Sequence, residues 1–193
     1  MKVVGSVIAR LGSKRLTYKN LLPYKGKPLV LRAVEFLQSC SGLDEVVLST
    51  DSELIARTCL SSSVRILRRP AELCGDDVAS VPVFRHIVEN FPSDLHVNYN
   101  CNFPECPPDV VERALSLARE TGEALSEPFA VWAQTAERLE NYGNPFDITA
   151  TRFSDERIHP LDIHHMEDLL EVHRVHQPEW ADGWRDEPCE KKE

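Results

Sequence analysis

The sequence lacks any long hydrophobic run. None of its stretches approaches the roughly 18 consecutive apolar residues that a membrane-spanning helix requires. The first apolar segment, residues 3–9, is too short and too weakly flanked by charge for a signal peptide. These absences predict a cytoplasmic protein that has no membrane partner.

Several motifs with a known chemistry are also missing. The chain has six cysteines but no C-x-x-C pair, and the closest two, Cys101 and Cys106, lack a second pair at zinc-ligand spacing. The eight glycines form neither G-x-G-x-x-G nor G-x-x-x-x-G-K-[ST]. We therefore expect reduced thiols, and neither a dinucleotide fingerprint nor an ordinary ATPase loop.

Positive charge is scarce overall. The formal net charge is −9 and the isoelectric point lies near 5.3, so a nucleic-acid backbone would be repelled by most of the surface. This balance excludes extended nucleic-acid binding and predicts no nucleic-acid partner. It leaves room for a small anion at one local basic patch.

Acidic residues are absent from one window, residues 10–27, which follows the first apolar segment. A glycine there, Gly12, allows a tight turn, and arginine forks together with lysine point charges suit phosphate oxygens. Composition alone leaves two interpretations open, a phosphate-binding loop and a solvated charged face. The six cations of the window are Arg10, Lys14, Arg15, Lys19, Lys25 and Lys27.

Short apolar runs alternate with segments of helical period. This order predicts an α/β fold, namely a Rossmann-like, doubly wound and mostly parallel sheet with helices on both faces. Ligands of such sheets bind outside the carboxyl ends of the strands, where the basic window begins. Asp51 follows the second run and is expected to cap the next helix. The runs are residues 3–9, 45–50, 64–67 and 95–100.

The later part of the chain has a looser pattern. We expect strands at 129–134 and 147–153, a short helix from Ala136, and a last helix over 166–176. The length suits a single domain, residues 1–176. Residues 177–193 are polar, contain two prolines and have no period, which predicts a mobile C-terminal tail.

Four segments occur in an order that resembles a known family. They are ARLGSKRLTYKNL followed by GKPL, then VVLSTDSELIA, then RRPAELCGDDVASVPVFRHIVE, and finally HPLDIHHMEDLLEVHR. Together they cover residues 3–175 and resemble the acylneuraminate cytidylyltransferases (CMP-sialic acid synthetases), which are related to the Kdo cytidylyltransferases. The resemblance implies a nucleotidyltransferase that moves CMP from CTP to an acidic keto-deoxy sugar, such as a sialic acid, and releases pyrophosphate.

The resemblance also assigns roles to residues of this chain. It implies that Arg10 and Lys19 are catalytic, because they would stabilise charge developing on the phosphates, and that Asn100 binds substrate, either the sugar or the base. It implies one Mg²⁺ ion, with Asp162 as a ligand. Subunit pairing in the family makes a homodimer an option. The implied nucleotide-binding residues are Arg10, Gly12, Ser13, Arg15, Lys19, Asn20, Arg69 and Ser80.

The chain departs from the family at three places. His164 stands where a second metal-binding aspartate is common, and Asn102 lies near the position of a metal-binding aspartate in the Kdo enzymes. The region between Pro108 and Asp162 is shorter than the family's. Two alternatives therefore stay open: a degenerate member that binds a nucleotide or a partner without catalysis, and a nucleotidyltransferase for another sugar.

Overall fold

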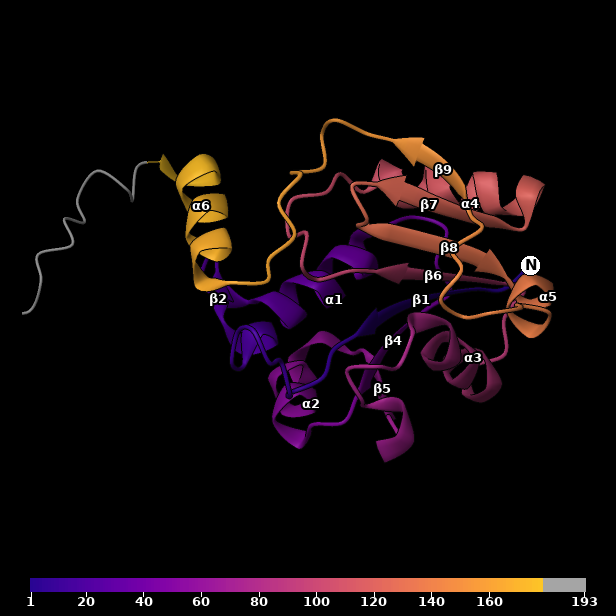
Figure 1. The fold of residues 1–193 in the computed structure, drawn as a ribbon, viewed down its shortest axis with the longest axis horizontal. Helices are drawn as coiled ribbons and strands as arrows, with labels where there is room; N and C mark the ends of the chain where they lie inside the picture. Colours follow the sequence, from indigo (N-terminus) through magenta and orange to yellow (C-terminus); the bar gives the residue numbers. More distant parts are fainter. Residues whose placement is uncertain (179–193) are drawn as a thin grey trace, which may run out of the picture.

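A seven-stranded sheet forms the centre of the computed structural model, which describes residues 1–178 (Figure 1). The strand order is β5-β4-β1-β6-β8-β7-β9, and only β8 runs against the others. The mostly parallel sheet predicted from the sequence is thus confirmed. The strands are β1 (Val3–Ile8), β4 (Glu45–Thr50), β5 (Arg65–Arg68), β6 (Leu95–Tyr99), β7 (Glu123–Glu127), β8 (Val131–Thr135) and β9 (Thr151–Ser154).

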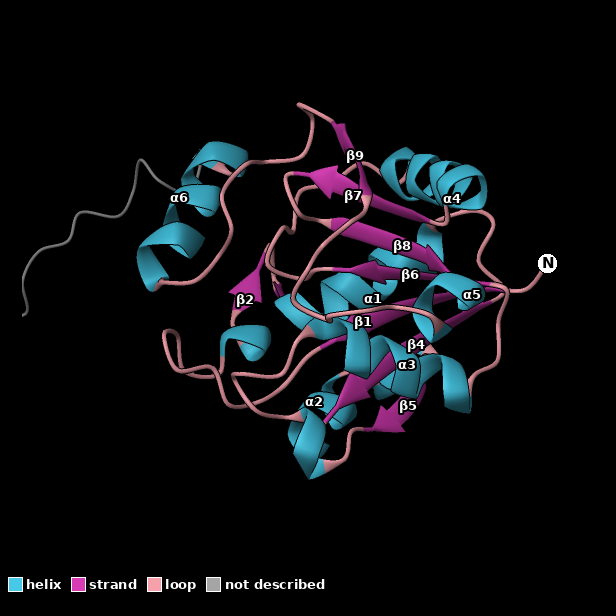
Figure 2. Cartoon of the chain, turned by 45° about the vertical axis from the view of Figure 1, so that its right-hand side comes forward, coloured by secondary structure: helices cyan, strands magenta, loops and turns pink. Residues whose placement is uncertain are grey.

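Helices cover both faces of this sheet (Figure 2). On one face, α1 and α4 bury side chains such as Val34 and Ala114 against Val7 and Val97. On the other face, α3 and α5 pack Phe84 and its neighbours against the sheet. The helices are α1 (Leu29–Ser39), α2 (Glu53–Thr58), α3 (Ser80–Asn90), α4 (Asp109–Thr121), α5 (Ala136–Glu140) and α6 (Met166–His176).

A small hairpin connects the basic window to α1. Its strands β2 (Pro23–Tyr24) and β3 (Lys27–Pro28) are antiparallel, and the two residues between them, Lys25 and Gly26, have φ values of 46° and 77°. Two successive positive φ values are typical of a type I′ turn, for which glycine is favoured. The hairpin was not predicted, because a two-residue strand leaves no alternating pattern.

The last helix returns to the beginning of the chain. Leu169 and Val172 of α6 pack with Ile163 against Leu16 and Tyr24 in a third, separate cluster. In Figure 1, α6 accordingly lies beside β2, away from the main body of the sheet. This packing brings the segment that precedes α6 next to the basic window.

Several boundaries differ from the predictions. The strand expected over 147–153 begins only at Thr151, and β7 was missed because it follows α4 directly at Gly122, whose φ of 85° ends that helix. Ser52 caps α2 in place of Asp51 by accepting a hydrogen bond from the Ile55 amide. Most of the predicted mobile tail, residues 179–193, lies outside the described residues. None of the described helices is long and apolar enough to cross a bilayer.

Candidate functional site

A cavity of about 510 Å³ lies at the carboxyl ends of the parallel strands. Its walls come from the loop after β1, the residues that follow β5 and β6, the beginning of α3 and the segment before α6. Of the ten predicted site residues, Gly12 and Asp162 are not among those that line it. The predicted residues that the structure brings together here are Arg10, Ser13, Arg15, Lys19, Asn20, Arg69, Ser80 and Asn100.

Hydrogen bonds within the loop after β1, and from it to residues that follow β4 and β6, hold this loop in place. The Leu11 amide donates to Asp51 Oδ1 at 3.0 Å, and Asn20 Nδ2 donates to the Arg10 carbonyl at 2.9 Å. The Cys101 thiol donates to Asn20 Oδ1 at 3.1 Å, which connects the loop to the end of β6. Asp51 thus orders the loop instead of capping α2.

Gly12 has no close neighbour in this loop. A Cβ atom at this position would meet nothing within 4 Å, and Gly12 is not one of the positive-φ glycines. The tight turn that the sequence suggested at Gly12 is therefore not required by the structure. The loop leaves open space at this position instead.

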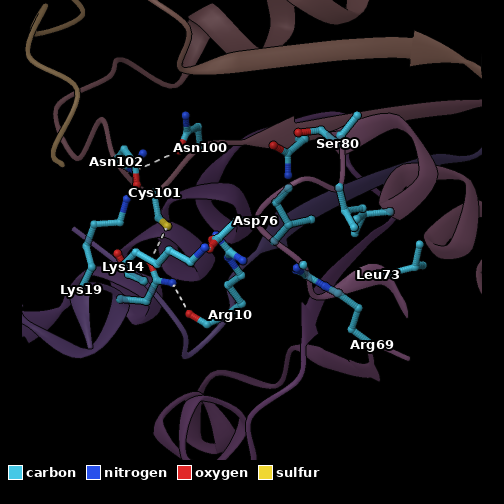
Figure 3. A pocket seen from close by; sticks show the side chains of 18 of the residues that line it. Arg10, Lys14, Lys19, Arg69, Leu73, Asp76, Ser80, Asn100, Cys101 and Asn102 are labelled. Carbon is cyan, nitrogen blue, oxygen red and sulfur yellow. Dashed lines mark hydrogen bonds and ion pairs between the residues drawn. The ribbon is translucent and has the colours of Figure 1, made fainter. Parts of the chain in front are cut away.

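Two cations of the loop share one carboxylate, that of Asp76. Arg10 contacts Asp76, while its Nη1 atom donates to the Cys74 carbonyl at 2.9 Å, and Lys14 Nζ lies 2.6 Å from Asp76 Oδ2. These hydrogen bonds from Lys14 and Arg10 lower the pKa of Asp76. Asp76 lies between the two cations in Figure 3, at the position where the sequence predicted a bound anion. Sequence reasoning missed it, although the acidic turn Gly75–Asp77 was a visible signal.

Lys19 joins the loop to the segment before α6. Its Nζ atom donates to the Ile163 carbonyl at 3.1 Å, and burial lowers its pKa from the ordinary value. The side chain is therefore held at one point and desolvated. Desolvation strengthens the interaction of an ammonium group with a nearby anion, because water screens it less.

Arg69 forms part of the opposite wall and is buried. Its Nε and Nη2 atoms donate to the hydroxyl and carbonyl oxygens of Ser49 at 3.3 and 2.8 Å. Burial lowers its pKa, although a guanidinium keeps its charge in proteins. Arg69 is therefore a fixed part of the cavity wall and not a solvated surface arginine.

The predicted metal ligand Asp162 has two protein partners. Asn102 Nδ2 donates to its Oδ1 atom at 2.8 Å, and His164 Nε2 lies 3.1 Å from its Oδ2 atom. Asp168 fixes this segment by accepting hydrogen bonds from the His164 and His165 amides. Burial lowers the pKa of His164, which favours the neutral imidazole.

This donor set does not fit a magnesium site. Mg²⁺ prefers oxygen ligands in octahedral geometry, whereas an amide NH₂ group and an imidazole face the one carboxylate here. Among residues 1–178, no three or more His, Cys, Asp or Glu side chains are arranged to hold a metal ion. The role predicted for Asp162 stays a prediction.

The far end of the cavity is less charged. Ser80 begins α3, and the apolar side chains of Ile8, Val83 and Phe129 line the cavity with the buried Asn98. Figure 3 shows Ser80 and Leu73 well apart from Lys19 and Lys14. The cavity thus has an end with several cations and a less charged end, where Arg69 accompanies apolar, amide and hydroxyl groups, as an amphipathic, polyanionic ligand requires.

Comparisons with known proteins agree with this geometry. A family model described as "Cytidylyltransferase" matches residues 4–168. A 3-deoxy-manno-octulosonate cytidylyltransferase from Zea mays is 26% identical over 124 residues, which are 64% of this chain and 41% of that protein. An N-acylneuraminate cytidylyltransferase from Streptococcus agalactiae serotype V is 30% identical over 93 residues, 47% of this chain and 22% of that protein.

The fold also has solved counterparts. A CMP:2-keto-3-deoxy-manno-octonic acid synthetase complexed with CTP superposes with a TM-score of 0.78 at 17% identity, and the match covers 93% of this chain and all of that one. The matched stretch spans less than half the length of either curated relative. The comparisons therefore establish the fold and the family, and the substrates belong to a proposal.

Proposed function

Because this chain belongs to the cytidylyltransferase family, we propose that it transfers CMP from CTP to an acidic keto-deoxy sugar and releases pyrophosphate. One observation carries the proposal. In a protein of net charge −9, the cavity is lined by five cations, Arg10, Lys14, Arg15, Lys19 and Arg69, and by a single carboxylate, Asp76. Such an excess of positive charge suits a triphosphate together with an acidic second substrate.

The reaction is a displacement at the α-phosphorus of CTP. A sugar hydroxyl oxygen forms a bond to this phosphorus, the bond to the β-phosphate oxygen breaks, and the hydroxyl proton leaves to water or to a nearby base. Negative charge grows on the departing pyrophosphate. Catalysis of such a step comes mainly from positioning and from fixed positive charge, so a potent base is not required.

The residues of this chain supply that fixed charge. Lys19 is desolvated and anchored to the Ile163 carbonyl, so its ammonium group would not need to reorganise as charge develops. Arg10 is anchored through Nη1 to the Cys74 carbonyl, which leaves its contact with Asp76 as the one that a phosphate would replace. We assign both residues to the triphosphate, together with Ser13, Arg15 and Asn20 of the same loop.

The remaining predicted residues suit the nucleoside and the sugar. Arg69 and Ser80 line the less charged end, where the nucleoside would lie. Asn100 Nδ2 donates to the Phe129 carbonyl at 3.3 Å and its Oδ1 atom accepts from the Asn102 amide at 3.1 Å. We propose that Asn100 contacts the sugar from this fixed position. A magnesium ion at Asp162 and a homodimer remain predictions from the family resemblance.

The class of sugar is proposed by analogy with the relatives. The matched proteins from Zea mays and Streptococcus agalactiae are named for 3-deoxy-manno-octulosonate and N-acylneuraminate, which are both acidic keto-deoxy sugars. A carboxylate on the sugar would add to the negative charge of CTP, and the five cations of the cavity can offset both. Turnover with a panel of such sugars identifies the one that the chain uses.

A second candidate function is nucleotide binding without catalysis. It is favoured by Asn102 and His164, which surround Asp162 with an amide and an imidazole instead of a second carboxylate. The two functions share the nucleotide site and differ only in turnover. A measurement of pyrophosphate release therefore separates the two functions.

The experiment measures pyrophosphate release from CTP with 3-deoxy-manno-octulosonate, N-acetylneuraminate and pseudaminic acid, with and without Mg²⁺. Catalysis predicts release with at least one sugar and a loss of two or more orders of magnitude in Lys19→Ala. The matched control is Lys27→Ala, because Lys27 is half-exposed, pairs with Glu35 and lies outside the cavity. CTP binding without release across the panel would favour the non-catalytic function.

A further inference from the structure

A chain of hydrogen-bonded side chains crosses the sheet and ends at the cavity. Gln134 of β8 lies beside His96 of β6, with Oε1 and Nδ1 3.1 Å apart, and His96 Nε2 is 2.8 Å from the hydroxyl of Ser6 in β1. Asn98 Nδ2 donates to that hydroxyl and to the Ser6 carbonyl, both at 3.1 Å. All four residues are buried, and only Asn98 lines the cavity.

The chemistry of the partners fixes the orientation of the Asn98 amide. A backbone carbonyl only accepts, so the atom that faces the Ser6 carbonyl must be the NH₂ group of Asn98. The Ser6 hydroxyl accepts from the same group, and its own proton has an acceptor when it is donated to His96 Nε2. His96 then carries its single proton on Nδ1 and donates it to Gln134 Oε1.

The burial of His96 agrees with this assignment. Desolvation lowers its pKa to about 4, so the ring is neutral near pH 7 and holds one proton, as the chain requires. Ser6, His96 and Gln134 thus act as positioning residues for the Asn98 side chain. With this assignment each donor from His96 to Asn98 meets an acceptor, and the Nε2 atom of Gln134 is the end of the chain that has no partner among the described residues.

The outcome is a carbonyl oxygen that has no hydrogen-bond partner in the described part of the chain. The NH₂ group of Asn98 is fully used by Ser6, while its Oδ1 atom accepts no hydrogen bond from any of residues 1–178. Asn98 lines the cavity, so a ligand bound there would displace water from this oxygen, and a ligand that supplies a donor would avoid leaving it unpaired. Ile8, Val83 and Phe129 line the same cavity and offer apolar walls for a flat ring.

We propose that Asn98 determines base specificity by accepting a hydrogen bond from the 4-amino group of cytosine; this inference rests on the function proposed above. Cytosine presents a donor at this position, whereas uracil presents an acceptor that would face Oδ1 with like polarity. Because Ser6 holds the amide, Asn98 is unable to rotate and offer its NH₂ group to uracil. The preference for cytosine therefore depends on hydrogen bonds between sheet residues that fix the orientation of the Asn98 amide.

The test compares CTP with two other triphosphates: UTP, whose base has an oxygen at position 4 and a proton on N3, and the pyrimidin-2-one analogue, which differs from CTP only in lacking the 4-amino group. Dissociation constants are measured by calorimetry without a sugar, for the wild type and for Asn98→Ala. We expect the wild type to bind CTP roughly ten-fold or more tightly than the other two. In Asn98→Ala the three constants should converge, mainly through weaker binding of CTP.

Two further variants keep the test decisive. Ser6→Ala retains the carbonyl partner but removes the hydroxyl link, so it should reduce the preference for CTP over UTP without abolishing it. Asn102→Ala removes another amide from the cavity lining, one that is paired with Asp162, and should leave the CTP to UTP ratio unchanged. If Asn98→Ala does not fold, two other results test the role of Asn98. The role is supported if the wild type prefers CTP over the pyrimidin-2-one analogue and Ser6→Ala reduces this preference, and it is overturned if either result fails.

The outcomes separate this inference from the proposed function. A preference for CTP that survives in Asn98→Ala would overturn the role of Asn98 and leave the proposed function standing. A wild type that binds CTP and UTP equally would do the same. Absence of binding to any nucleotide would overturn both.

Discussion

The buried imidazole of His96 should make the stability of this protein depend on pH in a defined interval. Desolvation lowers the pKa of His96 from 6.5 to about 4, and the ring is fully buried against Phe84 at a centroid distance of 4.8 Å. In the unfolded chain the imidazole titrates near 6.5. Between these two values the unfolded state binds one proton more than the folded state does.

The sign and size of the effect follow from this difference. The contribution of the neutral ring is fully present above pH 6.5 and is lost as the pH falls, until the loss is complete near pH 4. The gap between 6.5 and about 4, at about 1.36 kcal/mol for each pH unit, corresponds to about 3 kcal/mol of unfolding free energy.

Urea unfolding at pH values from 4 to 8 measures this loss. The matched variant is His96→Gln, which keeps a polar side chain but does not titrate, and carboxylates that titrate below pH 5 affect both proteins alike. The difference between the two stability curves should change by about 1.36 kcal/mol per pH unit between 6.5 and 4. Parallel curves over this interval would refute a neutral, desolvated His96.

Three other perturbations test the site and the core. Asp76→Asn should tighten the binding of CTP and of pyrophosphate several-fold, because it releases Arg10 and Lys14 from their ion pairs with the carboxylate. Equal affinities in Asp76→Asn and in the neighbouring control Asp77→Asn would contradict this. Arg138→Ala removes the ion pair of the buried Glu123 carboxylate and leaves it with Trp132 and Thr149 as side-chain partners, so thermal unfolding should show a loss on the order of 2 kcal/mol of unfolding free energy. A loss no larger than that caused by replacing an exposed arginine would argue against this. Millimolar Mg²⁺ without nucleotide should not stabilise the wild type more than Asp162→Asn; a stabilisation that Asp162→Asn abolishes would show that the aspartate holds the ion after all.

Local charge and periodicity were enough to predict the centre of the fold and one end of the cavity. The basic window stands out because its cations occur without acids, and β1 and β4 are apolar runs that any buried parallel strand resembles. The strand order places this loop at the carboxyl edge, as expected for an α/β sheet. These features depend on neighbours in the sequence.

The missed features depend on contacts between distant segments. Asn98 looks like an ordinary polar residue in a strand until Ser6, 92 positions away, fixes its amide. Asp76 gains its role from Arg10 across 66 positions. Asp51 was predicted to cap α2, but the amide of Leu11 takes its carboxylate and Ser52 caps instead. A single sequence shows the acidic turn that contains Asp76, but it carries no pattern that reports which distant residue each of these side chains contacts.

The central claim is that the cationic cavity binds CTP, and thermal unfolding with CTP, UTP, ATP and GTP tests it most directly. A ligand at about a hundred times its dissociation constant adds about 2.7 kcal/mol of stability, which is a readily measured shift for a domain of this size. The account predicts a shift with CTP that exceeds those of the other three nucleotides and that is lost in Lys19→Ala. Equal melting temperatures with and without every nucleotide would contradict it.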